Sequence, residues 1–113
     1  MIENIDLRYQ EEMQRIFKLL TNSTRLNILI LLENKQLSVN EIVQYLQIPQ
    51  PQVSHQLSIL KQHQLVTAER VGKNNLYKLD DPHILSVIES TKNHVKHIVN
   101  GKKWRTVITN LRL

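Results

Sequence analysis

Four residues near the C-terminal end of the chain have side chains that can bind a metal ion. Asp81 and His83 form the pattern Asp-x-His, and His94 and His97, which follow eleven residues later, form His-x-x-His. Carboxylates and imidazoles are good ligands for a borderline metal such as Zn²⁺. One carboxylate and three imidazoles fill a tetrahedral set and leave no position for a catalytic water. The pattern therefore predicts a regulatory or structural ion and not an enzyme's hydrolytic centre.

The spacing of the two ligand pairs predicts that each ion is shared by two chains. The segment that carries them reads as one helix, in which eleven residues make three turns and rise about 16 Å. The pairs therefore point in the same direction but lie too far apart to bind one ion together. Two antiparallel copies of this helix would bring Asp81 and His83 of one chain to His94 and His97 of the other. We therefore expect a homodimer with two intersubunit sites.

The composition is that of a small basic globular protein. A length of 113 residues, with 41% hydrophobic residues and only two Gly and three Pro, predicts one domain with a modest core. The absence of Cys excludes a disulfide scaffold and a thiolate metal site. With no signal-peptide pattern and no run of about 20 apolar residues, a cytoplasmic protein without a membrane partner is expected. The net charge of +5 favours a polyanionic partner.

The middle of the chain predicts a helix-turn-helix after two N-terminal helices. Ser38 and Glu41 match a capping box that begins a short helix, and Pro49 and Pro51 separate it from a second one. In the second helix an apolar stripe faces inward and leaves a polar outer face. The stripe comprises Val53, Leu57 and Leu60. The residues expected to contact DNA from this helix are Gln50, Gln52, Ser54, His55, Gln56, Ser58 and Lys61.

A basic β-hairpin is predicted directly after these helices. The runs 65–71 and 76–79 favour extended structure, and the Gly/Asn-rich segment 72–75 between them favours a turn. Such a hairpin would lie along a phosphate backbone as a wing. The residues expected to contact phosphates are Arg70, Lys73, Asn74 and Lys78.

The last predicted helix runs from Asp81, as N-cap, to about residue 100. Its apolar stripe would pack on the first helix and on the partner's last helix. The midpoint of the two ligand pairs lies near Ile88 and Glu89, where we expect the two-fold axis. We divide the chain into one domain of residues 1–101 and a tail of residues 102–113 that no pattern assigns.

This order of elements resembles the ArsR/SmtB family of bacterial metal-responsive repressors. The segments 51–60 and 76–81 resemble the family's recognition helix and the end of its wing, and the likeness covers roughly residues 10 to 99. It implies a mainly α, winged helix-turn-helix fold with a two-stranded β-hairpin wing and a long C-terminal dimerisation helix. The four ligands resemble the motif of the family's zinc- and cobalt-sensing branch. The arsenite-, cadmium- and lead-sensing branch is excluded because its ligands are cysteines.

The resemblance implies a dimeric repressor that binds double-stranded operator DNA without metal and releases it with Zn²⁺, Co²⁺ or possibly Ni²⁺. No small-molecule substrate is expected. One alternative is a repressor of the same fold whose interfacial zinc is structural and whose trigger is another signal. A second alternative, a small zinc enzyme, is disfavoured because the coordination set is filled. Asp80 is expected to support the ligands, although it is also an alternative to Asp81.

Overall fold

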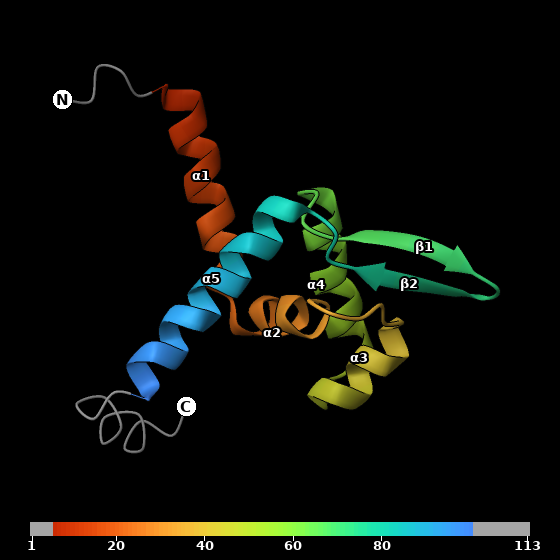
Figure 1. The fold of residues 1–113 in the computed structure, drawn as a ribbon. Helices are drawn as coiled ribbons and strands as arrows, with labels where there is room; N and C mark the ends of the chain where they lie inside the picture. Colours follow the sequence, from red (N-terminus) through yellow and green to blue (C-terminus); the bar gives the residue numbers. More distant parts are fainter. Residues whose placement is uncertain (1–5, 101–113) are drawn as a thin grey trace. The chain divides into compact units, whose positions relative to one another are not determined.

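The computed structural model describes residues 6–100 and has a mainly helical fold with one β-hairpin (Figure 1). The helix-turn-helix, the wing and the long last helix that the sequence predicts are all present. The tail of residues 102–113 lies outside the described residues. The described chain divides into two compact units between Asp81 and Pro82. In chain order the elements are α1 (Leu7–Leu20), α2 (Ser23–Leu31), α3 (Val39–Leu46), α4 (Gln50–Gln62), β1 (Thr67–Val71), β2 (Asn74–Lys78) and α5 (Pro82–Val99).

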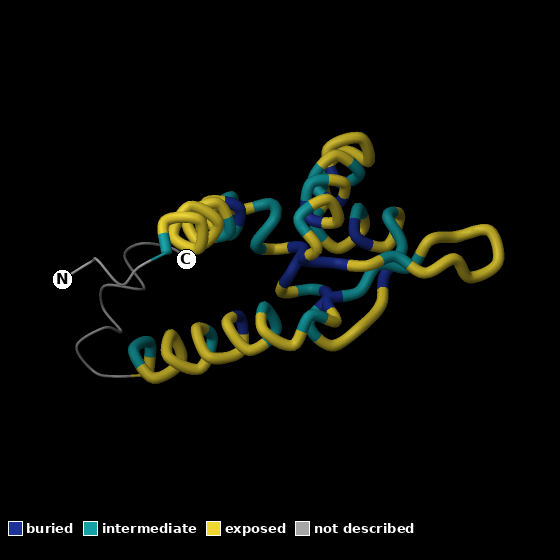
Figure 2. The backbone as a smooth tube through the Cα atoms, turned by 90° about the horizontal axis from the view of Figure 1, so that it is seen from above, coloured by how far each residue is buried: buried dark blue, intermediate teal, exposed yellow. Residues whose placement is uncertain are grey.

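The core of the first unit forms where α2, α3 and α4 pack together. The helix α2 contacts α1, α3 and α4, and α3 also contacts β2. Buried positions gather where these elements meet (Figure 2). The predicted inward stripe of α4 is confirmed, because Val53, Leu57 and Leu60 are at most 1% exposed. The expectation that α2 is buried on nearly every side is wrong at Ile30, whose side is not covered by the three neighbouring helices and which is 41% exposed.

The turn between α3 and α4 is fixed by capping interactions that the sequence predicts. The Ser38 amide donates to Glu41 Oε1 at 2.8 Å, and the Glu41 amide donates to Ser38 Oγ at 3.2 Å. Gln47 then ends α3 in the left-handed conformation at φ 57°, and Pro49 stands at the N-cap of α4. Pro51 lies in the first turn of α4, where a missing backbone N–H costs no intrahelical hydrogen bond.

Replacing Ser38 by Ala is expected to lower the free energy of unfolding by about 1 kcal/mol, because the capping box loses one of its two hydrogen bonds. Urea unfolding followed by circular dichroism measures this loss. The matched control is Ser58→Ala, at an exposed position inside α4 where Ala favours the helix. Equal losses in the two variants would show that the capping box contributes nothing.

The wing differs from the prediction at its turn and at its base. The strands pair in antiparallel register from Thr67 with Lys78 to Val71 with Asn74, which leaves Gly72 and Lys73 as a two-residue loop. The predicted turn was too long, because Asn74 and Asn75 belong to β2. Gly72 has φ +63°, a conformation that glycine adopts without strain.

The base of the wing is tied into the core by residues that the sequence assigned to other places. Leu65 and Val66, expected at the start of the first strand, are buried ahead of β1. Leu37 pairs with Tyr77 through two backbone hydrogen bonds of 2.8 and 3.0 Å, so the chain ahead of α3 adds a short third pairing to the hairpin. This contact holds the wing beside the start of α3.

The second unit contains the long helix α5. Pro82 is its first residue, as predicted, and the helix ends at Val99, close to the expected end. Its apolar residues recur at helical spacing, and among them Val87 and Val95 are 40% and 47% exposed. None of the helices in the described range is both long and apolar enough to cross a membrane.

Candidate nucleic-acid interface and metal ligands

The outer face of α4 presents a row of polar side chains opposite its buried stripe. Gln52, His55 and Ser58 recur every third residue and are all exposed. Their carboxamide, imidazole and hydroxyl groups can donate to and accept from base edges in a major groove. Lys61, one turn beyond Ser58, is exposed as well and offers a cation at the end of the row.

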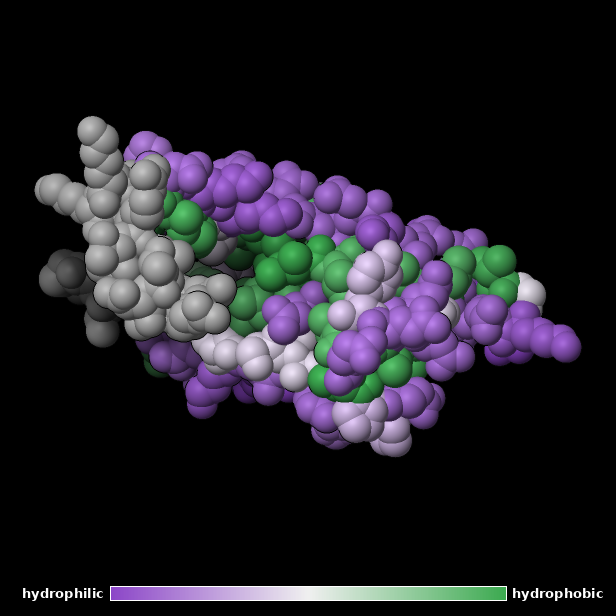
Figure 3. Space-filling model, turned by 90° about the horizontal axis from the view of Figure 1, so that it is seen from below, coloured by the Kyte–Doolittle hydropathy of each residue, from purple (hydrophilic) through white to green (hydrophobic). Residues whose placement is uncertain are grey.

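The first residues of α4 lie beside the tip of the wing. Gln50 lines a depression of about 170 Å³ together with Lys73 and Asn74 of the wing and with Ser38 and Asn40 at the start of α3. The wing is covered mainly by hydrophilic side chains (Figure 3). Sequence reasoning did not identify Ser38 and Asn40 as part of this surface. Only the pairing of Leu37 with Tyr77, which no local pattern predicts, brings them to the wing.

Three of the predicted contact residues are partly engaged within the chain. Gln50 Nε2 donates to Ser54 Oγ at 3.4 Å, which holds the half-buried Ser54 against the helix start. Arg70 Nε donates to the Gly72 carbonyl at 3.0 Å, so part of its guanidinium stabilises the wing loop. Lys78 Nζ lies 3.8 Å from Asp80 Oδ2, at the base of the wing and not at its exposed tip.

Gln56 differs from its neighbours on α4 because its side chain is half-buried. Its Oε1 accepts a hydrogen bond of 2.9 Å from Nη1 of Arg25, which lies in the first turns of α2. Sequence reasoning missed Arg25. The available signal was a single cation in the otherwise apolar helix Ser23–Leu31, since a charged group at such a position needs a partner.

The three candidate histidine ligands all lie on α5. His83 is its second residue, and His94 and His97 lie in its last two turns. All three are exposed, whereas Asp81, which directly precedes the helix, is half-buried. Among the described residues of one chain, no three His, Asp or Glu side chains come together. The donor types fit zinc, and the two pairs lie in separate parts of one chain.

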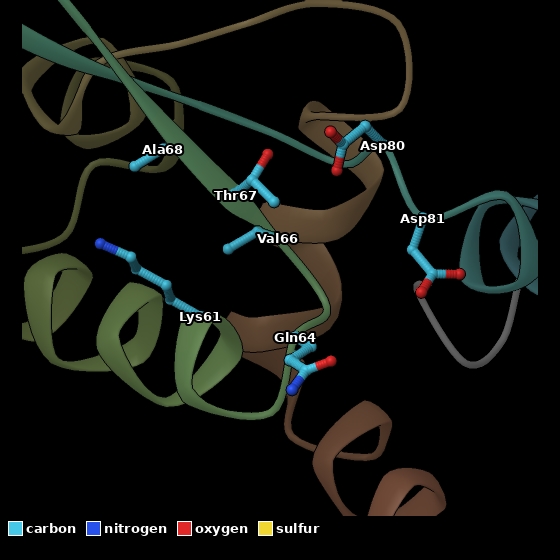
Figure 4. A pocket seen from close by; sticks show the side chains of 7 residues that line it. All are labelled: Lys61, Gln64, Val66, Thr67, Ala68, Asp80 and Asp81. Atoms are coloured by element: carbon cyan, nitrogen blue, oxygen red, sulfur yellow. The ribbon is translucent and has the colours of Figure 1, made fainter.

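Asp81 lines a second depression that also contains the end of α4. This depression has a volume of about 540 Å³. Lys61 and Gln64 lie on one side of it, and Asp80 and Asp81, which follow β2, lie on the other (Figure 4). The candidate ligand Asp81 and the end of the polar helix α4 therefore share one surface of the first unit.

Comparison with known proteins agrees with this geometry. Residues 22–68 match the model of the family described as bacterial regulatory protein, arsR family. A transcriptional repressor SmtB homolog from Synechocystis is 30% identical over 94 residues, which cover 83% of this chain and 71% of that protein. The HTH-type transcriptional repressor SmtB of Mycobacterium tuberculosis is 38% identical over 73 residues, which cover 65% of this chain but only 54% of that protein. The solution structure of apo-NmtR aligns with a TM-score of 0.73 and 29% identity, over 86% of this chain and 82% of that one.

Proposed function

Since the chain belongs to the arsR family of bacterial regulatory proteins and has its winged helix-turn-helix fold, we propose that it is a dimeric, metal-responsive repressor. It binds operator DNA without metal and releases the DNA when Zn²⁺ or Co²⁺ binds between two chains. The observation that carries this proposal is the separation of the ligand pairs. His83 and His94 are three helical turns apart on α5, and no three potential ligands meet within the described part of one chain.

The proposed ligands are Asp81 and His83 of one chain with His94 and His97 of the other. This set of one carboxylate and three neutral imidazoles suits a tetrahedral ion and leaves no open position for a substrate. A bound divalent cation would supply two positive charges and a link between the chains. The exposed imidazoles on α5 are accessible to a second chain, and their neutral form binds metal, so the affinity for metal falls as the pH is lowered.

The surface that Asp81 shares with α4 supports the proposed coupling between metal and DNA. The Asp81 carboxylate lines the same depression as Lys61 and Gln64 at the end of the recognition helix. A change in the position of Asp81 on joining an intersubunit site therefore acts on residues next to the DNA-binding helix. Two recognition helices in a dimer must match successive major grooves, so a small change in their spacing is enough to weaken binding.

The proposed DNA contacts fall into two groups. Gln50, Gln52, His55 and Ser58 would contact bases or nearby phosphates from α4, and Lys61, Arg70, Lys73 and Asn74 would contact phosphates. Lys78, Ser54 and Gln56 are partly engaged in contacts within the chain, which assigns them a smaller direct role.

The proposed dimer is supported by apolar surface that a single chain leaves exposed. On α1, Tyr9, Met13 and Phe17 recur every fourth residue and are 70%, 56% and 54% exposed. On α5, Val87 and Val95 are exposed too. Such stripes mark helix faces that a partner covers.

A chain carrying Glu89→Cys is expected to form a disulfide-linked dimer rapidly under mild oxidation, because the proposed two-fold axis passes near this residue. The natural chain has no Cys, so the single introduced thiol gives an unambiguous product. Non-reducing electrophoresis measures the product, and Asn40→Cys, at an exposed position on α3, is the matched control. Equal cross-linking of the two variants would contradict the antiparallel pairing of α5.

Titration of the whole chain with Co²⁺ tests the metal site while DNA release is followed in the same sample. The proposal predicts intense visible bands of tetrahedral Co²⁺ that saturate at one ion per chain, together with loss of bound DNA. Weak bands of an octahedral ion, or saturation without release of DNA, would contradict it.

A further inference from the structure

Arg25 connects three helices of the first unit through its guanidinium group. It lies near the start of α2, and its Nε donates to the Leu19 carbonyl of α1 at 2.9 Å. Its Nη1 donates to Oε1 of Gln56, in the middle of α4, also at 2.9 Å. Arg25 and Gln56 are both half-buried. One side chain therefore joins the end of α1 to the recognition helix.

Both hydrogen bonds satisfy groups that would otherwise be left poorly paired. The Leu19 carbonyl is among the last four of α1, which have no amide partner within the helix. A hydrogen bond from a charged guanidinium is roughly twice as strong as one between neutral groups, and the planar fork of arginine fixes the direction of both bonds. The contact is thus directional as well as favourable.

The bond to Arg25 removes Gln56 from the set of residues that can read a base fully. A glutamine that recognises adenine uses its oxygen to accept from N6 and its nitrogen to donate to N7. In Gln56 the oxygen already accepts from Arg25. Gln52, one turn earlier on the same helix, is exposed by comparison.

We infer that Arg25 and Gln56 form a brace that positions the recognition helix α4 on the end of α1, and that Gln56 does not read bases. This inference rests on the proposed function, in which α4 enters the major groove. Because α1 carries the exposed stripe of Tyr9, Met13 and Phe17, the brace sets the orientation of α4 relative to the surface through which two chains associate. Arg25 and Gln56 are positioning residues for DNA binding, and they act on the spacing of the two recognition helices.

The test compares base preference and affinity in full-length variants. The unmodified chain first enriches duplexes from a random DNA library, and each variant is then measured on the enriched duplex and on its single-base variants. Gln56→Glu keeps an acceptor for Arg25, whereas Arg25→Gln and Gln56→Met each remove the bond. Gln52→Glu is the matched control, since it adds the same negative charge to an exposed position of the same helix.

The brace predicts that Gln56→Glu retains the base preference of the unmodified chain and loses less affinity than Gln52→Glu. Arg25→Gln and Gln56→Met should each weaken binding to all duplexes by roughly tenfold, and the double variant should be no weaker than either alone, as for residues that act together. Circular dichroism identifies a variant that fails to fold, in which case Gln56→Met, which leaves Arg25 in place, decides the result.

A shift of preference from adenine to cytosine at one position in Gln56→Glu would overturn the inference, because a base-reading glutamate accepts from cytosine N4. Additive losses in the double variant would overturn it as well. If the unmodified chain enriches no duplex at all, the proposed function fails, and the brace loses its role with it. A chain that enriches DNA but shows the shifted preference fails only the brace.

Discussion

A chain carrying His97→Ala is expected to bind Co²⁺ at least about 100-fold more weakly than the unmodified chain. Loss of a residue that only supports a metal ligand typically costs 10- to 100-fold in affinity, so loss of a ligand itself should cost more. The Ala variant leaves three donors from two chains and opens the fourth position to water. Since His97 is exposed on α5, its removal should leave the fold unchanged.

Visible spectra recorded during a Co²⁺ titration measure this loss, because tetrahedral Co²⁺ absorbs far more strongly than the hydrated ion. The matched control is His55→Ala, which removes an equally exposed imidazole from α4 and not from the proposed site. The control should keep the full spectrum at one ion per chain. Loss of the bands in His55→Ala, or their retention in His97→Ala, would show that the ligands have been assigned wrongly.

Replacing both Arg70 and Lys73 by Ala is expected to make DNA binding much less sensitive to salt. Each phosphate contact contributes about 0.9 to the slope of log K against log salt, so two lost contacts lower the slope by about 1.8. Between 50 and 200 mM salt the ratio of wild-type to variant affinity should therefore shrink by roughly tenfold. Fluorescence anisotropy of a labelled duplex over a series of salt concentrations measures the slope.

The control for this variant removes the same charge from a helix that the account keeps away from DNA. Arg15 and Lys18 lie on α1, and replacing both by Ala changes the net charge by the same two units as the wing variant. A general effect of net charge would lower the slope equally in the two double variants. Only a change confined to the wing variant supports a wing that contacts phosphates.

Local patterns predicted most of the helical framework because each element carries its own signal. The capping box of Ser38 and Glu41, the prolines around α4 and the stripe of Val53, Leu57 and Leu60 all depend on residues close in sequence. Such features follow from capping, backbone restriction and helical periodicity. The family comparisons confirm the broader assignment to a winged helix-turn-helix regulator.

The features that the sequence did not predict depend on pairs that are far apart along the chain. Leu37 reaches Tyr77, and Arg25 reaches Gln56, which lies 31 residues away. Nothing within a few residues of Gln56 distinguishes it from Gln52, so both were assigned to DNA contact. Burial and the bond to Arg25 separate them. The wing loop was predicted too long because Asn74 and Asn75 favour turns locally, whereas cross-strand pairing holds them in β2.

The identity of the metal-binding partners depends on a second chain, which no pattern within one chain can describe. The ligand types and their spacing on α5 indicate a shared site, and the exposed stripe on α1 favours association. Whether the ion only stabilises the dimer or also controls DNA depends on the difference between two free energies of binding.

The measurement that addresses this directly is the affinity of the unmodified chain for its enriched duplex, with saturating Zn²⁺ and with a chelator. A metal-responsive repressor should bind about 5- to 150-fold more weakly with zinc, and His97→Ala should show the same affinity in both conditions. By linkage, DNA must weaken zinc binding by the same factor. Equal affinity of the unmodified chain with zinc and with the chelator would contradict the account and leave the ion a structural role.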